Sequence, residues 1–513
     1  MLASLALAEK NLPVRSDEGR RVLRNAATIG AFLAAPLHLF LMVRALGADG
    51  YGRWWWTFVL LEAASVLGVL GTDLYIRREI PQCADDEQGN ARATALVGTA
   101  LAVVTVLGIA FALLQIALAV PIANALGDDE LVAFLVILAF QAVLWSQGTV
   151  LGAALQSRHH LGALAVLRGI VFPLIVAAVY LVAWQAELPV RVTLFMMLAN
   201  SLVALLLVVP LYARRFSLGA TLRATLRPTL VRPAVASGIR LVIPLSLYLA
   251  GGKLDLYVLG AYYEPAYVGL YAACLQVCGL MPSVRGLFDP ILQAQVGMLF
   301  HRDPVQFGAS MRKLARLCAF ALAPAFVVTV SVGQPVLGWL IGATVPQTFD
   351  PIAVLAIGNL VAGIAVGSWI LPMTFAGRPM AIVASLAGLT KLGLLLWLVP
   401  RYGATGAAIA TSAAGIIALH MQSWLGVRQA GFRSFPASIV GILALALGVA
   451  AAARWLYVTL VGHMSELPAV TVTCAVAMTV LGAGILAMMT RDDRQELRRL
   501  LGMGAGGVPS SGS

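Results

Sequence analysis

The chain has 513 residues, of which 60% are hydrophobic and only 11% are charged, and its formal net charge is +12. A soluble protein carries about 25% charged residues, and this much apolar side chain is more than a folded soluble protein can keep from water. The composition therefore excludes a soluble globular protein, a disordered chain and a disulfide-rich secreted scaffold. It predicts a protein that crosses a membrane many times.

Apolar runs long enough to cross a bilayer recur along the whole chain. A transmembrane helix needs about 20 apolar residues, and only helices or closed barrels satisfy their backbone groups in lipid. Alternating strand patterns of the barrel type are absent from the sequence. We predict an all-α polytopic membrane protein with about fourteen transmembrane helices, at residues 22–45, 54–75, 94–118, 131–155, 163–184, 190–212, 240–261, 268–290, 315–341, 351–375, 379–399, 404–427, 436–461 and 467–490.

The basic residues give an independent test of this topology. With the N-terminus in the cytoplasm, most of the 35 Lys and Arg residues fall in cytoplasmic segments. The opposite side holds only Arg44, Arg53, Arg191, Arg401 and Arg454. This asymmetry follows the positive-inside rule and predicts that both termini are cytoplasmic. Because the basic residues flank membrane segments, they do not predict nucleic-acid binding.

A weak internal repeat predicts the division of the chain. Residues 36–41 (PLHLFL) are matched by residues 244–249 (PLSLYL), and both helices leave the cytoplasmic side. Parallel repeats of this kind are typical of transporters. We predict the following parts: a cytoplasmic N-terminal segment (1–21), an N-terminal six-helix lobe (22–212), a cytoplasmic linker (213–239), a C-terminal six-helix lobe (240–427), helices 13 and 14 (428–490) and a flexible cytoplasmic tail (491–513).

The segments outside the predicted helices are too short for a soluble catalytic domain. The sequence contains no phosphate-binding GxxxxGK[ST] loop, no HExxH and no GxSxG motif. The acidic runs at 85–87 and 128–130 are interpreted as solvated loops. Five scattered cysteines predict neither a disulfide nor a metal site. We therefore expect no enzyme, no metal and no organic cofactor.

Three segments carry a resemblance to a known family. They are residues 44–52 (RALGADGYG), residues 255–260 (DLYVLG) running into 268–271 (VGLY), and residues 399–411 (VPRYGATGAAIAT). In this order they resemble the polysaccharide-transporter (Wzx-like) flippases, members of the multidrug/oligosaccharidyl-lipid/polysaccharide (MOP) exporter superfamily, which also contains the MATE transporters. The characteristic early motifs of the related lipid II flippases are not seen, which makes the peptidoglycan precursor a poorer substrate prediction.

The resemblance implies two six-helix bundles around a central cavity and a fold that works by alternating access. It implies a bacterial cytoplasmic-membrane flippase that moves an undecaprenyl-diphosphate-linked oligosaccharide from the cytoplasmic to the periplasmic leaflet, for cell-surface polysaccharide biosynthesis. The implied partners are this lipid-linked glycan, membrane lipids, and the polysaccharide polymerase and glycosyltransferases of the same process.

Ionisable residues inside the predicted helices carry the site prediction, because each costs about 3 kcal/mol or more near the membrane centre. A diphosphate needs cations in a cavity of low dielectric constant. We predict that these are Arg44, Lys253, Arg285 and Lys391. The acids that are candidates for coupling to Na⁺ or H⁺ are Glu62, Asp255 and Asp289.

Spacing limits how these charges can pair. Arg285 and Asp289 are four residues apart, so mutual neutralisation is an open alternative to a role in binding. Lys253 and Asp255 are two residues apart and cannot pair on one regular helix, so at least one faces a cavity or another helix. The tryptophans at 54–56 are expected to form an aromatic belt at the membrane interface, with sugar stacking as the alternative.

Two alternatives to a glycan flippase stay open. A cation-coupled multidrug exporter of the same superfamily would favour a cavity with acids and few cations, and Lys253, Arg285 and Lys391 inside the helices argue against it. A non-transporting scaffold for glycan assembly has no need of charges at mid-membrane.

Overall fold

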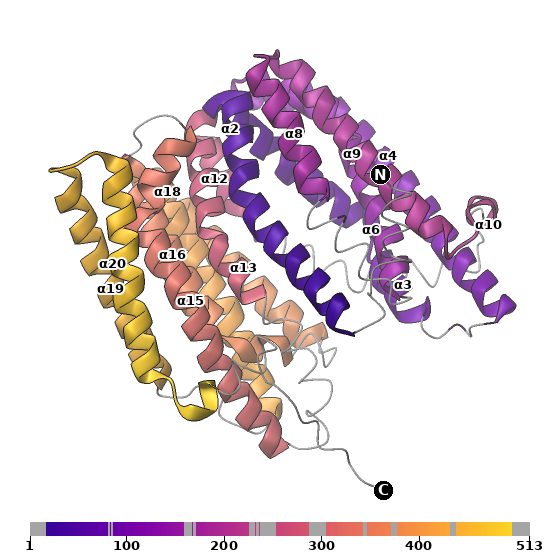
Figure 1. The fold of residues 1–513 in the computed structure, drawn as a ribbon. Coiled ribbons are helices and arrows are strands. Elements are labelled where there is room, and N and C mark those ends of the chain that lie inside the picture. Colours follow the sequence, from indigo (N-terminus) through magenta and orange to yellow (C-terminus); the bar gives the residue numbers. More distant parts are fainter. Residues whose placement is uncertain are drawn as a thin grey trace, which may run out of the picture. The chain divides into compact units, whose positions relative to one another are not determined.

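The computed structural model describes residues 17–80, 86–157, 171–224, 253–286, 304–341, 346–370, 377–430 and 438–494, with single residues 83, 167, 231 and 235 between them. Within these ranges all regular secondary structure is helical (Figure 1). The predicted all-α membrane fold is therefore confirmed.

Several predictions concern residues outside the described ranges. These are the N-terminal segment as far as residue 16, nearly all of the linker after residue 224, the repeat segment at 244–249, Asp289, and the tail from residue 495.

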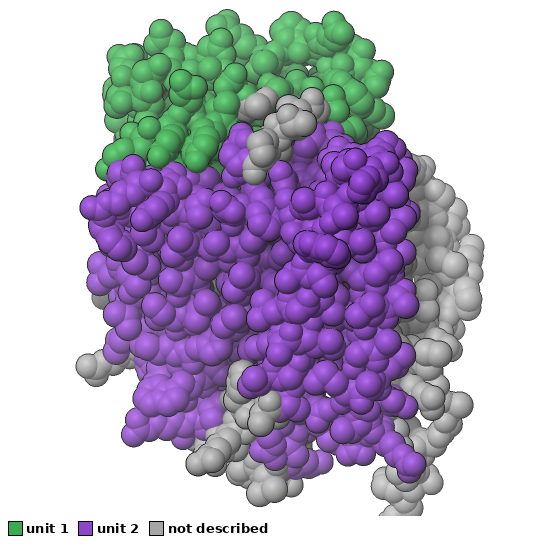
Figure 2. Space-filling view, turned by 90° about the vertical axis from the view of Figure 1, so that its left-hand side faces the viewer, with its two compact units in different colours: residues 1–276 green, residues 277–513 purple. Residues whose placement is uncertain are grey.

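The chain divides into two compact units, Met1–Gln276 and Val277–Ser513, which Figure 2 shows in different colours. The first unit includes the helices α2 (Asp17–Val69), α3 (Thr72–Glu79), α4 (Glu87–Leu126), α5 (Leu131–Leu138), α6 (Gln141–Ser157), α8 (Phe172–Gln185), α9 (Val190–Ala213) and α10 (Leu218–Arg223). A helical stretch at 253–262 follows. The next helix, α12 (Pro265–Cys278), runs across the boundary between the units.

The second unit contains α13 (Leu280–Gly286), α15 (Pro304–Ile341), α16 (Phe349–Gly363), α18 (Gly377–Ala430), α19 (Ser438–Val461) and α20 (Glu466–Met488). Two short 3₁₀ helices, η3 (Pro346–Thr348) and η4 (Val366–Trp369), flank α16.

Among the described residues, eight helices are long and apolar enough to cross a membrane. Each of the fourteen predicted spans overlaps a helix, although some neighbouring spans are joined into one long helix and others are interrupted. The total of fourteen and the division into two six-helix lobes stay predictions.

Two glycines break helices where the sequence predicts a turn between spans. Gly47 interrupts α2 with φ 71° and ψ 175°, and Gly403 interrupts α18 with φ 53° and ψ −129°. Such backbone conformations are open to glycine and strained for residues with a Cβ. One residue therefore redirects the chain at each position, and the helix resumes directly after it.

Polar side chains join helices in the first unit, where α4, α6 and α9 lie side by side (Figure 1). The Gln141 amide donates to the Ser201 hydroxyl over 3.0 Å, which links α6 to α9. The Gln147 amide donates to the Thr105 hydroxyl over 3.0 Å, which links α6 to α4. Hydrogen bonds of this kind satisfy polar groups that lipid cannot, and they fix neighbouring helices together.

In the second unit, α15 packs against α16, α19 and α20 around an apolar core. At the end of α20, Arg316 of α15 donates to the Asp493 carboxylate over 2.7 Å. The same carboxylate, only 3% exposed, accepts from the backbone N–H of Thr490. These contacts attach the segment after α20 to α15.

Replacement of Gly47 by Ala should strain the break in α2, because a residue with a Cβ rarely adopts its φ and ψ values. We expect the free energy of unfolding to fall by about 1–3 kcal/mol, measured by thermal or denaturant unfolding of the purified protein in detergent. Gly148→Ala is the matched control, because a Cβ at this helical position meets nothing within 4 Å. Equal loss of stability in both variants would contradict the assignment.

Candidate functional site

Within the first unit, α2 and the 253–262 helix pack against each other in antiparallel directions. A Cβ on Gly260 would overlap the indole of Trp56, and a Cβ on Gly52 would overlap the carbonyl of Pro265, the first residue of α12, which follows this helix. Further along, the Trp56 and Tyr257 rings meet edge to face at 5.1 Å. The two glycines thus allow the helices to approach closely, and we call this contact the glycine seam.

Lys253 lies at one end of the glycine seam, over aromatic rings of α2. Its ammonium nitrogen is 4.9 Å from the centre of the Trp55 ring and 5.9 Å from that of Phe58. Among the described residues, no carboxylate forms an ion pair with Lys253. An aromatic face attracts a cation without cancelling its charge. The positive charge is therefore stabilised by the protein and is still able to attract an anion.

The tryptophans next to Lys253 lie inside the protein. Trp54 is 6% exposed and Trp55 is 3% exposed. The prediction that they form a belt facing the membrane interface is therefore wrong for these two residues. A position near the end of a span indicates such a belt, but in α2 Trp54 and Trp55 pack with Phe58, and Phe58 in turn contacts Trp145 of α6.

Asp255 faces a different helix from Lys253, as their spacing predicts. Its side chain is fully buried, and one carboxylate oxygen accepts a hydrogen bond of 2.9 Å from the hydroxyl of Tyr271 in α12. Tyr271 is fully buried as well. Burial of a carboxylate is costly unless hydrogen bonds stabilise it, and Tyr271 provides one. The sequence analysis did not identify this tyrosine as a site residue.

Glu62 lies on the face of α2 that carries Trp55 and Phe58, because the three residues have i, i+3, i+7 spacing. Its Oε2 atom is buried without a hydrogen-bond partner among the described residues. The side chain is close enough to Tyr257 for an electrostatic interaction. The glycine seam therefore brings Glu62, Lys253 and Asp255 into one region of the first unit.

The other predicted site residues lie elsewhere. Arg285 of α13 donates to the hydroxyl of Ser368 over 2.7 Å, and Lys391 of α18 is only 3% exposed; both belong to the second unit. Arg44 is exposed, and its guanidinium lies 5.7 Å and 5.8 Å from the ring centres of Phe40 and Trp184. The predicted pairing of Arg285 concerns Asp289, which is outside the described residues.

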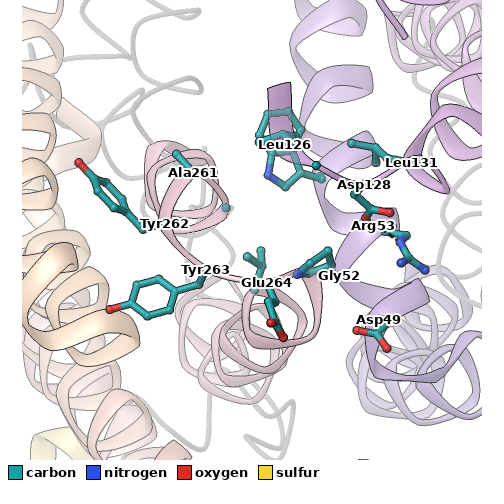
Figure 3. Close-up of a pocket in the computed structure, with 15 residues that line it drawn as sticks. Asp49, Gly52, Arg53, Leu126, Asp128, Leu131, Ala261, Tyr262, Tyr263 and Glu264 are labelled. Carbon is teal, nitrogen blue, oxygen red and sulfur yellow. Dashed lines mark hydrogen bonds and ion pairs between the residues drawn. The ribbon is translucent and has the colours of Figure 1, made fainter. Parts of the chain in front are cut away.

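A cavity of about 510 Å³ opens at the other end of the glycine seam, still within the first unit (Figure 3). Its lining includes Trp56 and Gly260 from the seam, and it also includes the turn between α4 and α5. We call it the seam cavity. It is lined by Asp49, Gly52, Arg53, Trp56, Leu126, Gly127, Asp128, Leu131, Gly260, Ala261, Tyr262, Tyr263, Glu264, Pro265 and Val268.

An ion-pair network holds one wall of the seam cavity. Arg53 donates to the Asp128 carboxylate over 2.7 Å and also pairs with Glu130. Burial acts to lower the pKa of Arg53, but the hydrogen bond to Asp128 and the charges of the neighbouring carboxylates outweigh it and raise this pKa above its ordinary value. The interpretation of residues 128–130 as a solvated loop is wrong for Asp128, which is 11% exposed and paired.

Replacement of Tyr271 by Phe should remove the hydrogen bond to the buried Asp255 carboxylate. We expect the free energy of unfolding to fall by about 1–3 kcal/mol, because a buried carboxylate loses a donor. Unfolding of the purified protein in detergent measures the change. Tyr262→Phe is the control, since Tyr262 is 53% exposed; if both variants were as stable as the wild type, the Asp255–Tyr271 contact would carry no stability.

Solved structures share this fold at low sequence identity. The lipid II flippase MurJ in an inward closed conformation matches with a TM-score of 0.67 and 12% identity, over 93% of this chain and 100% of that chain. The MATE multidrug transporter DinF-BH matches with a TM-score of 0.58 and 15% identity, over 82% and 96%. A MOP superfamily transporter from Pyrococcus furiosus, whose binding pocket has reversed polarity, matches with a TM-score of 0.56 and 14% identity, over 81% and 98%.

The sequence comparisons identify the family. No curated protein sequence matches the chain significantly. The family model described as polysaccharide biosynthesis protein matches residues 25–293, which is more than half of the chain. The chain therefore belongs to the polysaccharide biosynthesis protein family and has the helical fold of the MOP-superfamily membrane transporters.

Proposed function

We propose that this protein is a flippase that moves a polyprenyl-diphosphate-linked oligosaccharide from the cytoplasmic to the outer leaflet of a bacterial cytoplasmic membrane, by alternating access. Membership of the polysaccharide biosynthesis family supports this function. The fold supports it as well, since the match to the lipid II flippase spans 93% of this chain, whereas the matches to MATE transporters span 80–84%.

The single observation that carries the proposal is the position of Lys253. A diphosphate carries at least two negative charges and must leave the headgroup region to cross the membrane, so it needs a cation on its path. Lys253 offers that cation on aromatic rings, with no carboxylate of the described residues to neutralise it. A diphosphate that replaces water at this ammonium would gain a charge-assisted hydrogen bond and would leave again when the cavity opens to the other side.

Lys391, Arg285 and Arg44 are proposed as further contacts for the diphosphate on its way through the protein. Lys391 is nearly fully buried, and in surroundings of low dielectric constant a cation attracts a phosphate strongly. Arg285 is half-buried, and its Nε atom has no hydrogen-bond partner among the described residues, so the guanidinium has a donor left for a phosphate oxygen. The exposed Arg44 would meet the headgroup near the outer leaflet.

Energy coupling would involve the acids, with Na⁺ and H⁺ as the alternative ions. Glu62 has a buried carboxylate oxygen with no hydrogen-bond partner among the described residues, and binding of a proton or a cation would relieve this cost. Asp255 is held by Tyr271 and is the second candidate. Asp289 stays a prediction from the sequence. Both termini are proposed to be cytoplasmic, and the polysaccharide polymerase and glycosyltransferases are proposed as partners.

A cation-coupled multidrug exporter is the second candidate, and the buried acids favour it. Glu62 and Asp255, with aromatic rings beside them, offer the acidic and apolar surroundings that a cationic drug would bind. Lys253 on the same seam opposes it, because a cationic drug would be repelled by the ammonium. A non-transporting scaffold is a third alternative, for which none of these charges would matter.

Flipping of a fluorescent polyprenyl-diphosphate oligosaccharide in proteoliposomes tests the proposal. The wild type should flip this lipid, and Lys253→Met, which keeps the length of the stem but removes the charge, should slow flipping about tenfold or more, which corresponds to about 1.4 kcal/mol of lost interaction. Lys391→Met should also slow flipping. Lys313→Met is the matched control, since Lys313 is about half exposed and pairs with Asp492 at the protein surface.

The outcomes separate the candidates. Flipping by wild type and by both variants at equal rates would keep the function and refute the role of these cations. No flipping by the wild type, together with export of a cationic dye that Glu62→Gln abolishes, would establish the drug exporter instead. No transport of either compound would favour the scaffold.

A further inference from the structure

The seam cavity combines polar groups of both kinds in a space suited to a ligand. Its volume of about 510 Å³ falls in the range of small-molecule sites, about 300–1,000 Å³. Arg53 supplies hydrogen-bond donors, and carboxylates of Asp49, Asp128 and Glu264 supply acceptors. In Figure 3 the rings of Tyr262 and Tyr263 point away from Arg53, so the polar groups define the chemistry of this cavity more than the tyrosine rings do.

The lining of the seam cavity contains more acidic than basic residues. Arg53 is committed to two carboxylates, Asp128 in the wall and Glu130 beside it. Asp49 and Glu264 are exposed, line the cavity and form no ion pair among the described residues. Figure 3 shows these two side chains on either side of Gly52. A ligand in the cavity therefore meets a net negative environment.

Sugar hydroxyls match this arrangement. Each hydroxyl both donates and accepts, so neighbouring hydroxyls can donate to a carboxylate and accept from the Arg53 guanidinium at the same time. A uronate adds a carboxylate of its own, which Asp49 and Glu264 would repel. We infer that the seam cavity binds the glycan portion of the transported lipid and selects uncharged or amino sugars over acidic ones.

The position of the cavity fits the chemistry of a lipid-linked glycan. Trp56 and Gly260 line the cavity and also form the seam that leads to Lys253. Gly260 comes seven positions after Lys253, which corresponds to about 10 Å along a helix. A glycan attached to a diphosphate at Lys253 would therefore have to extend about 10 Å to reach the cavity. The inference rests on the proposed function, since it assigns the sugar end of the same substrate.

The test compares two polyprenyl-diphosphate lipids that differ by one charge: one carries N,N′-diacetylchitobiose, and the other carries a disaccharide in which the second sugar is a uronate. Flipping of both is measured in proteoliposomes. The wild type should prefer the neutral lipid about tenfold or more, equivalent to about 1.4 kcal/mol. Glu264→Lys should shift the ratio of the two rates several-fold toward the acidic lipid. Asp49→Lys, a second variant on another element, should shift it in the same direction.

Asp129→Lys is the matched control. It makes the same change of charge at an exposed residue of the α4–α5 turn that does not line the cavity, so it should leave the ratio unchanged. Binding of the two free disaccharides to the full-length protein in nanodiscs, measured by calorimetry, gives a readout that does not depend on flipping.

If the wild type, Glu264→Lys and Asp49→Lys all transported both lipids with the same ratio of flipping rates, the inference would be overturned and the proposed function would stand. Binding of the neutral disaccharide that these two variants weaken, without flipping of either lipid, would support the sugar site and overturn the flippase. Neither binding nor flipping would overturn both.

Discussion

A lysine ammonium inside a membrane-spanning helix must be stabilised by the protein, because lipid offers it no partner. Lys253 belongs to a span predicted from the sequence, and the rings of Trp55 and Phe58 lie beside its ammonium, so that α2 and the 253–262 helix lie close together. Gly260 permits the approach, since a Cβ there would overlap Trp56 of α2, and Gly52 lets α2 approach the start of α12. The close approach of the two helices therefore places Lys253 over aromatic rings of α2.

The same constraint explains why the neighbouring acid has a different partner. Side chains two residues apart on a helix point in different directions, so Asp255 reaches Tyr271 of α12 while Lys253 reaches α2. The two charges of the 253–262 helix thus face different helices. Among uncharged groups, the amide of Gln141 likewise donates to Ser201 on a neighbouring helix.

The sequence predicts the helices and their breaks well because both depend on local properties. Apolar length indicates a span, and Gly47 and Gly403 mark breaks through their own backbone freedom. Contacts between residues that are far apart in the sequence are harder to predict. Arg53 and Asp128 are 75 residues apart in the chain, so nothing local indicates that they pair. Trp54 and Trp55 are buried because of the helices that pack against α2, and the periodicity of the sequence does not specify which helices these are. Tyr271 likewise gains its role only through the folded position of Asp255.

The contact between Lys253 and Trp55 also has a spectroscopic consequence. Indole emission responds to the electric field across the ring, and the ammonium places a positive charge 4.9 Å from its centre. An anion that binds Lys253 would reduce this field and change the emission of Trp55. Phe replacements at the other tryptophans would isolate the signal, so the side chain that holds the cation would also report, in real time, when an anion arrives at it.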